Sequence, residues 1–297
     1  MEIYFYKEKI DKVIENYNKL RKKMMFLGVS LAILVLILLI TTLIIFIKES
    51  SAIDYFGPIA FCFVFLITIF YVIFYAYKKN KYFYEEIDKL IISILRLETD
   101  YDVMKKYDKK GYTAKIYDTR IVSNGDSITL KSALSYETGN VKSDIYSLTA
   151  SRSNSNSSIT VIDGIVVSFD LKTNLDFQIR TDKIAPRGMK KLKTLSTKEY
   201  SVYSEQSLDT KNGVNEKLVK QIEWLKGKFD CRNVGIDYNR DCVSFYVSKK
   251  EILSFPKKLT TSSIEEMCKK YLECIENTKS FFLEVEKNEL ERLENYF

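Results

Sequence analysis

The chain of 297 residues contains no histidine, only three prolines and a single tryptophan. Without an imidazole it cannot form a Ser-His-Asp or Cys-His nucleophile, an HExxH metal site or the HRD loop of a kinase. Its ten glycines never fall in the G-x-G-x-x-G or G-x-x-x-x-G-K-[ST] spacing, so the dinucleotide-binding and P-loop classes are excluded. The sequence therefore predicts a protein that is not an enzyme and that carries no cofactor.

Charged residues are missing from two long stretches near the N-terminus. Met24–Ile47 is 24 residues long, and Gly57–Tyr77 is 21 residues long. As helices they would extend about 36 and 31 Å, enough to cross a hydrocarbon core of about 30 Å. We therefore predict transmembrane helices at 24–47 and 57–77, joined as a tight hairpin by an external loop at 48–56.

Lysine and arginine are unevenly distributed around the two uncharged runs. Seven precede the first run, Lys48 alone lies between the runs, and five more follow the second run as far as Arg96. Basic residues that flank membrane helices stay on the cytoplasmic side. We therefore expect a multi-pass protein of the cell inner (plasma) membrane, with both termini in the cytoplasm and the lipid bilayer as a partner.

Four of the five cysteines, Cys231, Cys242, Cys268 and Cys274, lie in the part expected to be cytoplasmic. Thiols are kept reduced in that compartment. A four-thiolate zinc site is an alternative, but spacings of ten and five intervening residues do not resemble a zinc finger or ribbon. We expect free thiols and no metal.

Three stretches outside the uncharged runs have the periodicity of amphipathic helices. Residues 1–23 lead into the first run, residues 78–110 follow the second run, and residues 261–297 close the chain, with a possible capping box at Ser262-x-x-Glu265. Their apolar residues recur three or four positions apart, for example Ile10, Tyr17, Ile87, Ile94, Tyr101, Ile264 and Ile275. We predict that the first two form an antiparallel cytoplasmic stalk, with the third as a possible member, although each could instead pack on the globular domain.

Residues 111–260 have the pattern of a mostly antiparallel α+β domain. Strands are predicted at Ala114–Tyr117, Ser127–Leu130, Ile145–Leu148, Ile159–Leu171, Asp176–Arg180, Val234–Tyr238 and Cys242–Val247. A helix is predicted at Val214–Lys226, a turn at Asn124-Gly125-Asp126, and a flexible polar loop at Ser151–Ser158. The predicted fold class is thus α+β, with a transmembrane hairpin and a helical stalk before the domain and a long helix after it.

Three segments of this half resemble an uncharacterised bacterial membrane-protein family, known as domain of unknown function 3137. They are a strand-Gly-strand segment at Ile159–Leu171, a strand ending in VYS with its following helix at Glu199–Lys226, and a closing strand with a polar turn at Cys242–Phe255. The family's usual Ser-Glu pair is Ser147-Leu148 here. The resemblance covers about residues 80 to 280. It implies two membrane spans ahead of a domain without an established activity.

Carboxylates and thiols offer the remaining routes to chemistry. Five aspartates lie near the ends of predicted strands: Asp163, Asp170, Asp176, Asp182 and Asp237. Turn propensity already explains aspartate at such positions. A thiol nucleophile at Cys231 or Cys242 would lack an imidazole base. An enzyme that works through aspartate and a divalent ion remains an alternative interpretation.

Lysines provide the clearest binding signal in the cytoplasmic part. Candidate contacts to an anionic surface are Lys105, Lys106, Lys109, Lys110, Lys190, Lys191, Lys193, Lys249 and Lys250. We predict a membrane-anchored binding or scaffold module that recognises a protein partner, a second copy or anionic lipid. Nucleic acid is not expected, because no aromatic-basic RNA signature is present. A two-span channel or membrane effector is a further alternative, but neither run holds an ionisable group to line a path.

Overall fold

The structure is a computed structural model. It describes residues 7–48, 66–67, 69–71, 73–75, 78, 85–96, 102–104, 109–138, 141–154, 157–173, 175–182, 184–193, 195–205, 216–249, 253 and 260–294. The chain divides into two compact units, residues 1–91 with 259–261 and residues 92–258 with 262–297.

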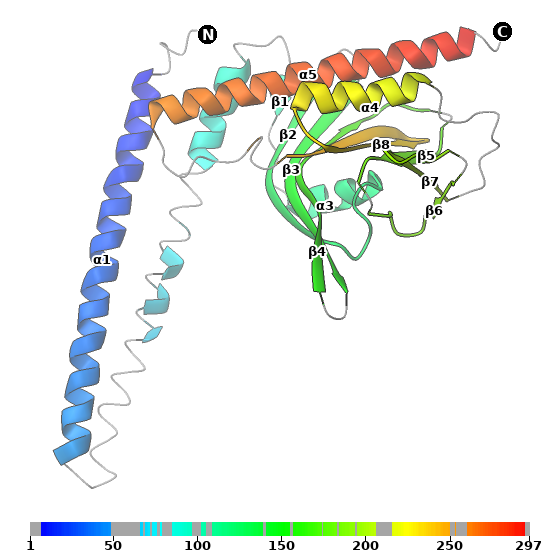
Figure 1. Ribbon diagram of the computed structural model, residues 1–297. Helices are drawn as coiled ribbons and strands as arrows, with labels where there is room; N and C mark the ends of the chain where they lie inside the picture. Colours follow the sequence, from blue (N-terminus) through cyan, green and yellow to red (C-terminus); the bar gives the residue numbers. More distant parts are fainter. Residues whose placement is uncertain are drawn as a thin grey trace. The chain divides into compact units, whose positions relative to one another are not determined.

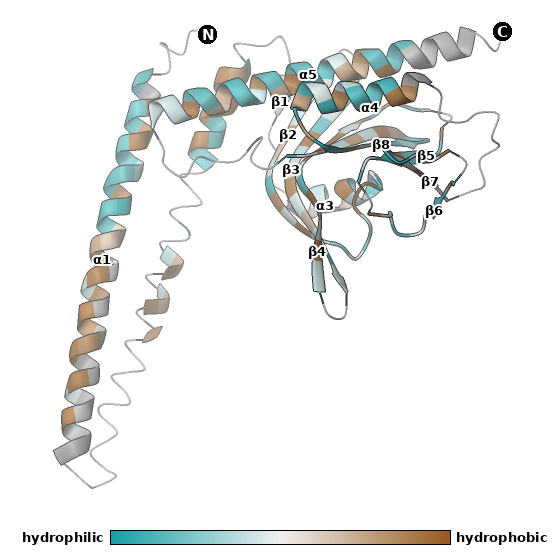
Figure 2. Ribbon diagram, viewed as in Figure 1, coloured by the Kyte–Doolittle hydropathy of each residue, from teal (hydrophilic) through white to brown (hydrophobic). Residues whose placement is uncertain are grey.

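The first unit is dominated by helix α1 (Lys7–Lys48). From Lys7 onward the helix is continuous through the described part of the predicted amphipathic segment and the whole of the first uncharged run, and its second half is strongly hydrophobic (Figure 2). Large apolar side chains are exposed there, among them Met25, Phe26, Leu27, Val29, Ile33, Leu34, Leu36, Ile37, Ile40 and Ile44. Among the residues described, no helix combines the length and the apolar character that a membrane crossing needs. The second predicted span and the connecting loop lie mostly outside the described residues.

A second helical stretch covers residues 85–96 and buries the predicted apolar stripe. Ile87, Leu90 and Ile91 of the first unit and Ile94 of the second are all buried. Asp88, a charged residue of the same stretch, is also buried. The prediction of one helix over 78–110 is wrong as well, because residues 102–104 form a strand. Tyr101 lies outside the described residues.

The second unit contains an antiparallel sheet, which confirms the α+β part of the predicted fold class. Its nine described strands are β1 (Asp102–Met104), β2 (Ser127–Thr138), β3 (Val141–Asn154), β4 (Ser157–Phe169), β5 (Phe177–Arg180), β6 (Lys190–Lys191), β7 (Ser201–Ser204), β8 (Asn233–Asn239) and β9 (Cys242–Ser248). Their order in the sheet is β1-β2-β3-β4-β9-β8-β5-β7-β6 (Figure 1). The short strands β1 and β6 thus form its two edges.

Helices α4 (Glu216–Phe229) and α5 (Thr261–Glu294) cover one face of this sheet (Figure 1). Aromatic rings make the contact: Phe281 of α5 lies 4.8 Å from Phe245 of β9 and 5.9 Å from Trp224 of α4, measured between ring centroids. Phe169 of β4 adds a tilted contact with Phe282 at 5.5 Å. The predicted C-terminal helix is therefore confirmed as a structural part of the sheet domain.

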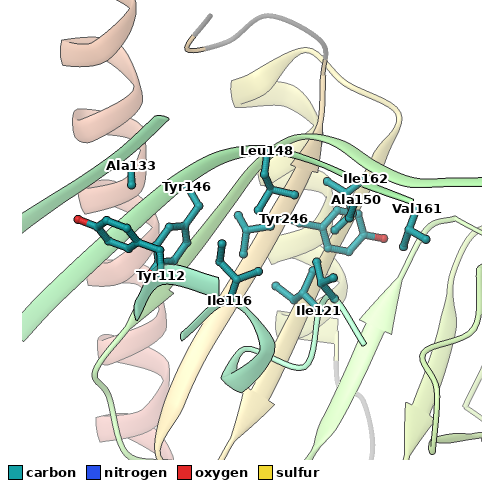
Figure 3. Close-up of a cluster of buried hydrophobic side chains, with 12 residues drawn as sticks. Tyr112, Ile116, Ile121, Ala133, Tyr146, Leu148, Ala150, Val161, Ile162 and Tyr246 are labelled. Carbon is teal, nitrogen blue, oxygen red and sulfur yellow. The ribbon is translucent and has the colours of Figure 1, made fainter. Parts of the chain in front are cut away.

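Helix α3 (Lys109–Asp118) packs on the opposite face. Successive residues of a strand point to opposite faces, and Tyr246, next to Phe245, belongs to the apolar cluster beneath α3 (Figure 3). Tyr112 and Ile116, one helical turn apart, enter this cluster from α3, where Tyr112 meets Tyr146 edge to face at 5.7 Å. Because these residues face the sheet at helical spacing, the strand predicted at Ala114–Tyr117 is wrong.

The hairpin between β3 and β4 is longer than its sequence suggests. Polar residues at Ser151–Ser158 predict a flexible loop, but β3 continues to Asn154 and β4 begins at Ser157. The ladder pairs Asn154 with Ser157 and Ser153 with Ser158. Strand pairing therefore overrides the loop preference of serine and asparagine, and the hairpin projects from the rest of the sheet (Figure 1).

Candidate functional site

The main polar feature of the sheet domain is the segment Thr119–Asp126, which follows α3 and which we call the clamp segment. Helix α3 ends at Asp118, and Arg120 then adopts a left-handed conformation with φ of 55°. This backbone conformation costs a residue with a Cβ atom roughly 1 kcal/mol. The predicted turn is confirmed at Gly125, whose φ is 91°. The clamp segment is held on the sheet by three arginine–aspartate clusters.

The first cluster is built around Arg120, whose side chain is only 18% exposed. Its guanidinium donates to Asp176 at 2.5 Å, to both carboxylate oxygens of Asp237 at 3.0 and 3.1 Å, and to the carbonyl oxygen of Tyr238 at 2.7 Å. Gln178 donates to the carbonyl oxygen of Arg120 and to Asp237, both at 3.2 Å. Burial raises the pKa of Asp237 to about 6, although Arg120 opposes the shift.

The second cluster surrounds Arg180 of β5, which is fully buried. Arg180 donates to Asp182 at 3.0 Å, to the hydroxyl of Tyr246 at 3.1 Å and to the carbonyl oxygen of Ile121 at 3.4 Å. The Tyr246 hydroxyl donates to Asp182. Burial raises the pKa of Tyr246 well above its ordinary value. The tyrosine therefore stays protonated and acts as a hydrogen-bond donor.

Gly235 makes the position of the Tyr246 ring possible. The two residues are opposite one another in the β8–β9 ladder. A Cβ atom on Gly235 would lie 2.3 Å from the tyrosine ring and 2.8 Å from the carbonyl oxygen of Ile179. Only glycine fits under this ring, because Cβ atoms do not approach other heavy atoms so closely.

The third cluster fixes the far end of the clamp segment. Arg152 of β3 donates to the two oxygens of the buried Asp126 at 2.8 and 3.0 Å and to the carbonyl oxygen of Ala185 at 2.8 Å. The backbone N–H of Arg187 donates to Ser123 at 3.0 Å. Burial alone would raise the pKa of Asp126, but hydrogen bonds and the charge of Arg152 hold it below its ordinary value. The clamp segment is thus tied to β3, β5 and β8.

The aspartates predicted near strand ends do not form a pair of free acids. Asp176 and Asp237 share Arg120, Asp182 binds Arg180, and Asp163 accepts from Lys131 at 2.6 Å. Asp170 is exposed. Within the described part of the chain, no three cysteine, aspartate or glutamate side chains are placed to hold a metal ion. The described arrangement of these carboxylates is that of ion pairs which join strands to the clamp segment.

Cys231 and Cys242 are half-buried and Cys268 and Cys274 are buried, and among the residues described none of these four forms a disulfide. Burial raises the pKa of Cys231 to about 11 and that of Cys274 to about 12. It also raises the pKa of Cys242. At neutral pH these three groups are therefore thiols and not reactive thiolates.

The structure groups only some of the predicted lysines. Lys190 and Lys191 form the edge strand β6, and Lys193 follows; all three are exposed. Lys249 lies elsewhere and donates to the carbonyl oxygen of Phe229 and to Asp230, at 3.0 and 3.3 Å. The side chains of Lys105, Lys106, Lys109, Lys110 and Lys250 lie outside the described residues. The exposed group Lys190, Lys191 and Lys193, which we call the β6 lysines, is thus the described candidate binding surface.

The arginine clusters could not be assigned from the sequence, although it holds one signal for them. Arg180 and Asp237 lie inside predicted strands, where an ionised side chain must either face water or find a partner. The sequence does not identify that partner, because Arg120 and Asp237 are 117 residues apart.

The chain matches no family model, no curated protein and no solved structure. The resemblance to domain of unknown function 3137 therefore stays a prediction.

Proposed function

We propose that the chain is a membrane-anchored module whose sheet domain binds, without catalysis, to the anionic lipid surface of the membrane that holds it. The observation that carries this function is the exposed group of β6 lysines in a domain whose aspartates are largely engaged by arginines and lysines. A membrane anchor holds the domain close to the bilayer, within the short distance over which the weak electrostatic attraction between lysines and anionic lipid acts.

The anchor is supported by α1 and by the sequence. Met24–Ile47 is entirely uncharged and lies within one continuous helix. Its large side chains, such as Phe26 at 74% and Leu36 at 59%, are exposed. Apolar side chains in such number are stable against lipid and costly against water. With the second uncharged run and the lysine asymmetry, they favour a two-span hairpin with both termini in the cytoplasm.

The surface charge of the sheet domain supports the lipid contact. Residues 111–260 contain 24 lysines and arginines against 17 aspartates and glutamates, and α5 adds five lysines and arginines against nine glutamates, so the sheet domain keeps a small positive balance. Asp126, Asp144 and Asp237 are buried and each binds a cationic side chain. These acids therefore contribute little negative charge to the surface, whereas the β6 lysines remain in solvent. Such residues attract anionic lipid by about 1 kcal/mol each.

Amine footprinting of the full chain in lipid nanodiscs tests this function. We expect acetylation of Lys190, Lys191 and Lys193 to be several-fold slower in discs with anionic lipid than in discs of neutral lipid alone. Raising the salt concentration to about 1 M, where the screening length is about 3 Å, should remove the protection. Lys269 and Lys287, which are exposed on α5, serve as internal controls and should label equally in both discs.

One result of the labelling experiment would refute the lipid contact. Equal labelling of the β6 lysines in both kinds of disc would show that the bilayer does not cover them. Protection that appears only when cell extract is added would indicate a protein partner instead.

A further inference from the structure

The β3–β4 hairpin exposes a strand edge that the proposed lipid contact does not use. Strand β9 pairs with β4 only from Ile165, opposite Val247, to Phe169. The outer part of β4, from Ser157 to Asp163, pairs with β3 alone among the described strands. Alternate backbone N–H and C=O groups along such an edge point away from the sheet and can bind another strand. This part of the hairpin projects beyond its neighbours (Figure 1).

The sequence of this edge lacks the lysine and proline that commonly protect an exposed edge against strand pairing. Exposed edges are commonly blocked by lysine, proline or a bulge, and β6 follows this rule with its two lysines. Ser157–Ile162, reading SSITVI, contains no charge, no proline and no glycine. Residues 157–160 are exposed, including Ile159 at 40%. We call Ser157–Ile162 the β4 edge.

One irregularity lies at the inner end of the β4 edge. The ladder shifts between Ala150 and Ser151, which leaves Val161 as an extra residue on β4. From Ser157 to Thr160 the register against β3 is unbroken. Four consecutive residues at the projecting end therefore keep regular strand geometry.

The charged residues next to the β4 edge are already engaged. Arg152, which is opposite Ile159 in the ladder, binds Asp126 and the carbonyl oxygen of Ala185. Asp163 accepts from Lys131 at 2.6 Å and from Thr149 at 2.9 Å. The edge therefore presents a neutral, β-branched strand that suits a partner strand of equally neutral character.

We infer that the β4 edge pairs with the β4 edge of a second copy of the chain. In an antiparallel pair related by a twofold axis the segment meets itself, so the neutral strand meets a neutral strand and no like charges are opposed. Serine and threonine hydroxyls are opposite β-branched side chains or one another in this arrangement. Two segments of this length bury less than the roughly 1,200 Å² of a stable interface, so the dimer dissociates on dilution and forms best between copies in one membrane.

Cysteine crosslinking of the full chain in its membrane tests the pairing. Ser158→Cys, Ile159→Cys and Thr160→Cys are oxidised in turn, beside the unmodified chain with its native cysteines. We expect a covalent dimer at least tenfold above that background for the position nearest the twofold axis. Ser280→Cys is the matched control, because Ser280 is exposed on α5, and it should stay at background.

A second substitution separates pairing from chance collision. Ile159→Lys in the Ser158→Cys and Thr160→Cys chains places like charges across the interface and should lower the dimer at least fivefold, whereas Ile159→Val should preserve it. Unchanged thermal unfolding of the Ile159→Lys chain checks that its fold is intact. Background crosslinking at all three positions, or crosslinking indifferent to Ile159→Lys, would overturn the inference.

Discussion

Replacing Arg120 by alanine should destabilise the sheet domain in a pH-dependent way. Arg120 is the described cation bound to Asp237, which is fully buried and has a pKa of about 6. Asp176, its other partner, is 25% exposed and can turn to water. The substitution therefore leaves Asp237 as a buried carboxyl that must take up a proton to stay folded.

The loss of stability on replacing Arg120 depends on whether Asp237 is protonated in the native protein and in the variant. Below about pH 6, Asp237 is already protonated in the native protein, so losing Arg120 costs its hydrogen bonds and its ion pair with Asp176, about 1 to 3 kcal/mol each. Above pH 6 the native protein releases the proton and the variant keeps it, because an unpaired buried acid has a pKa near 8 or higher. The stability difference should then grow by about 1.4 kcal/mol per pH unit, or about 3 kcal/mol between pH 6 and pH 8.

The single tryptophan makes this measurable. Trp224 packs on Phe281 between α4 and α5, so its fluorescence reports unfolding of the sheet domain in urea. We expect the native and Arg120→Ala curves of the full chain in detergent to separate as the pH rises from 5.5 to 8. In the Asp237→Asn background the pH-dependent part should vanish. A separation that is constant with pH would refute the reasoning.

Three further outcomes are expected. Gly235→Ala should cost more than about 2 kcal/mol, because its Cβ would lie 2.3 Å from the opposing tyrosine ring, whereas Gly227→Ala in α4, where a Cβ meets no atom within 4 Å, should be neutral or stabilising in the same urea assay. Ile94→Asp should lower the unfolding temperature strongly, since the side chain is 2% exposed and a buried charge without a partner costs several kcal/mol; an unchanged temperature would contradict its burial. A reporter active only outside the cytoplasm should be inactive after Phe297 and active within residues 48–56, and the opposite pattern would exclude the predicted orientation.

The elements that could be predicted are those whose pattern repeats within a few residues. Val234, Ile236 and Tyr238 alternate along β8 and all are buried, as the period of a strand requires. Helix α5 was recognisable because its apolar residues recur at helical spacing over 34 residues. Local periodicity therefore predicted most of the sheet and the two helices, α4 and α5, that cover one of its faces.

The errors arose where distant partners decide the local structure. Ala114–Tyr117 has the composition of a strand, but Tyr112 and Ile116 pack together on the sheet only from a helix. The serine-rich hairpin end has the composition of a loop and is extended because each strand supplies the partner of the other. The arginine–aspartate clusters depend even more on long-range contacts, since no spacing in the chain connects Arg120 to Asp237.

The place of β9 in the sheet has a consequence for how the protein is made. Strands β2, β3 and β4 follow one another along the chain and pair as neighbours, so they can assemble as soon as they leave the ribosome. The inner half of β4 cannot complete its pairing before β9 is synthesised, because Ile165 pairs with Val247. Until residues 242–248 are synthesised, the open edge of β4 extends over its whole length, including Val166 and Val167. A pause in translation before Cys242 would therefore prolong the stage at which nascent chains are most prone to associate with one another.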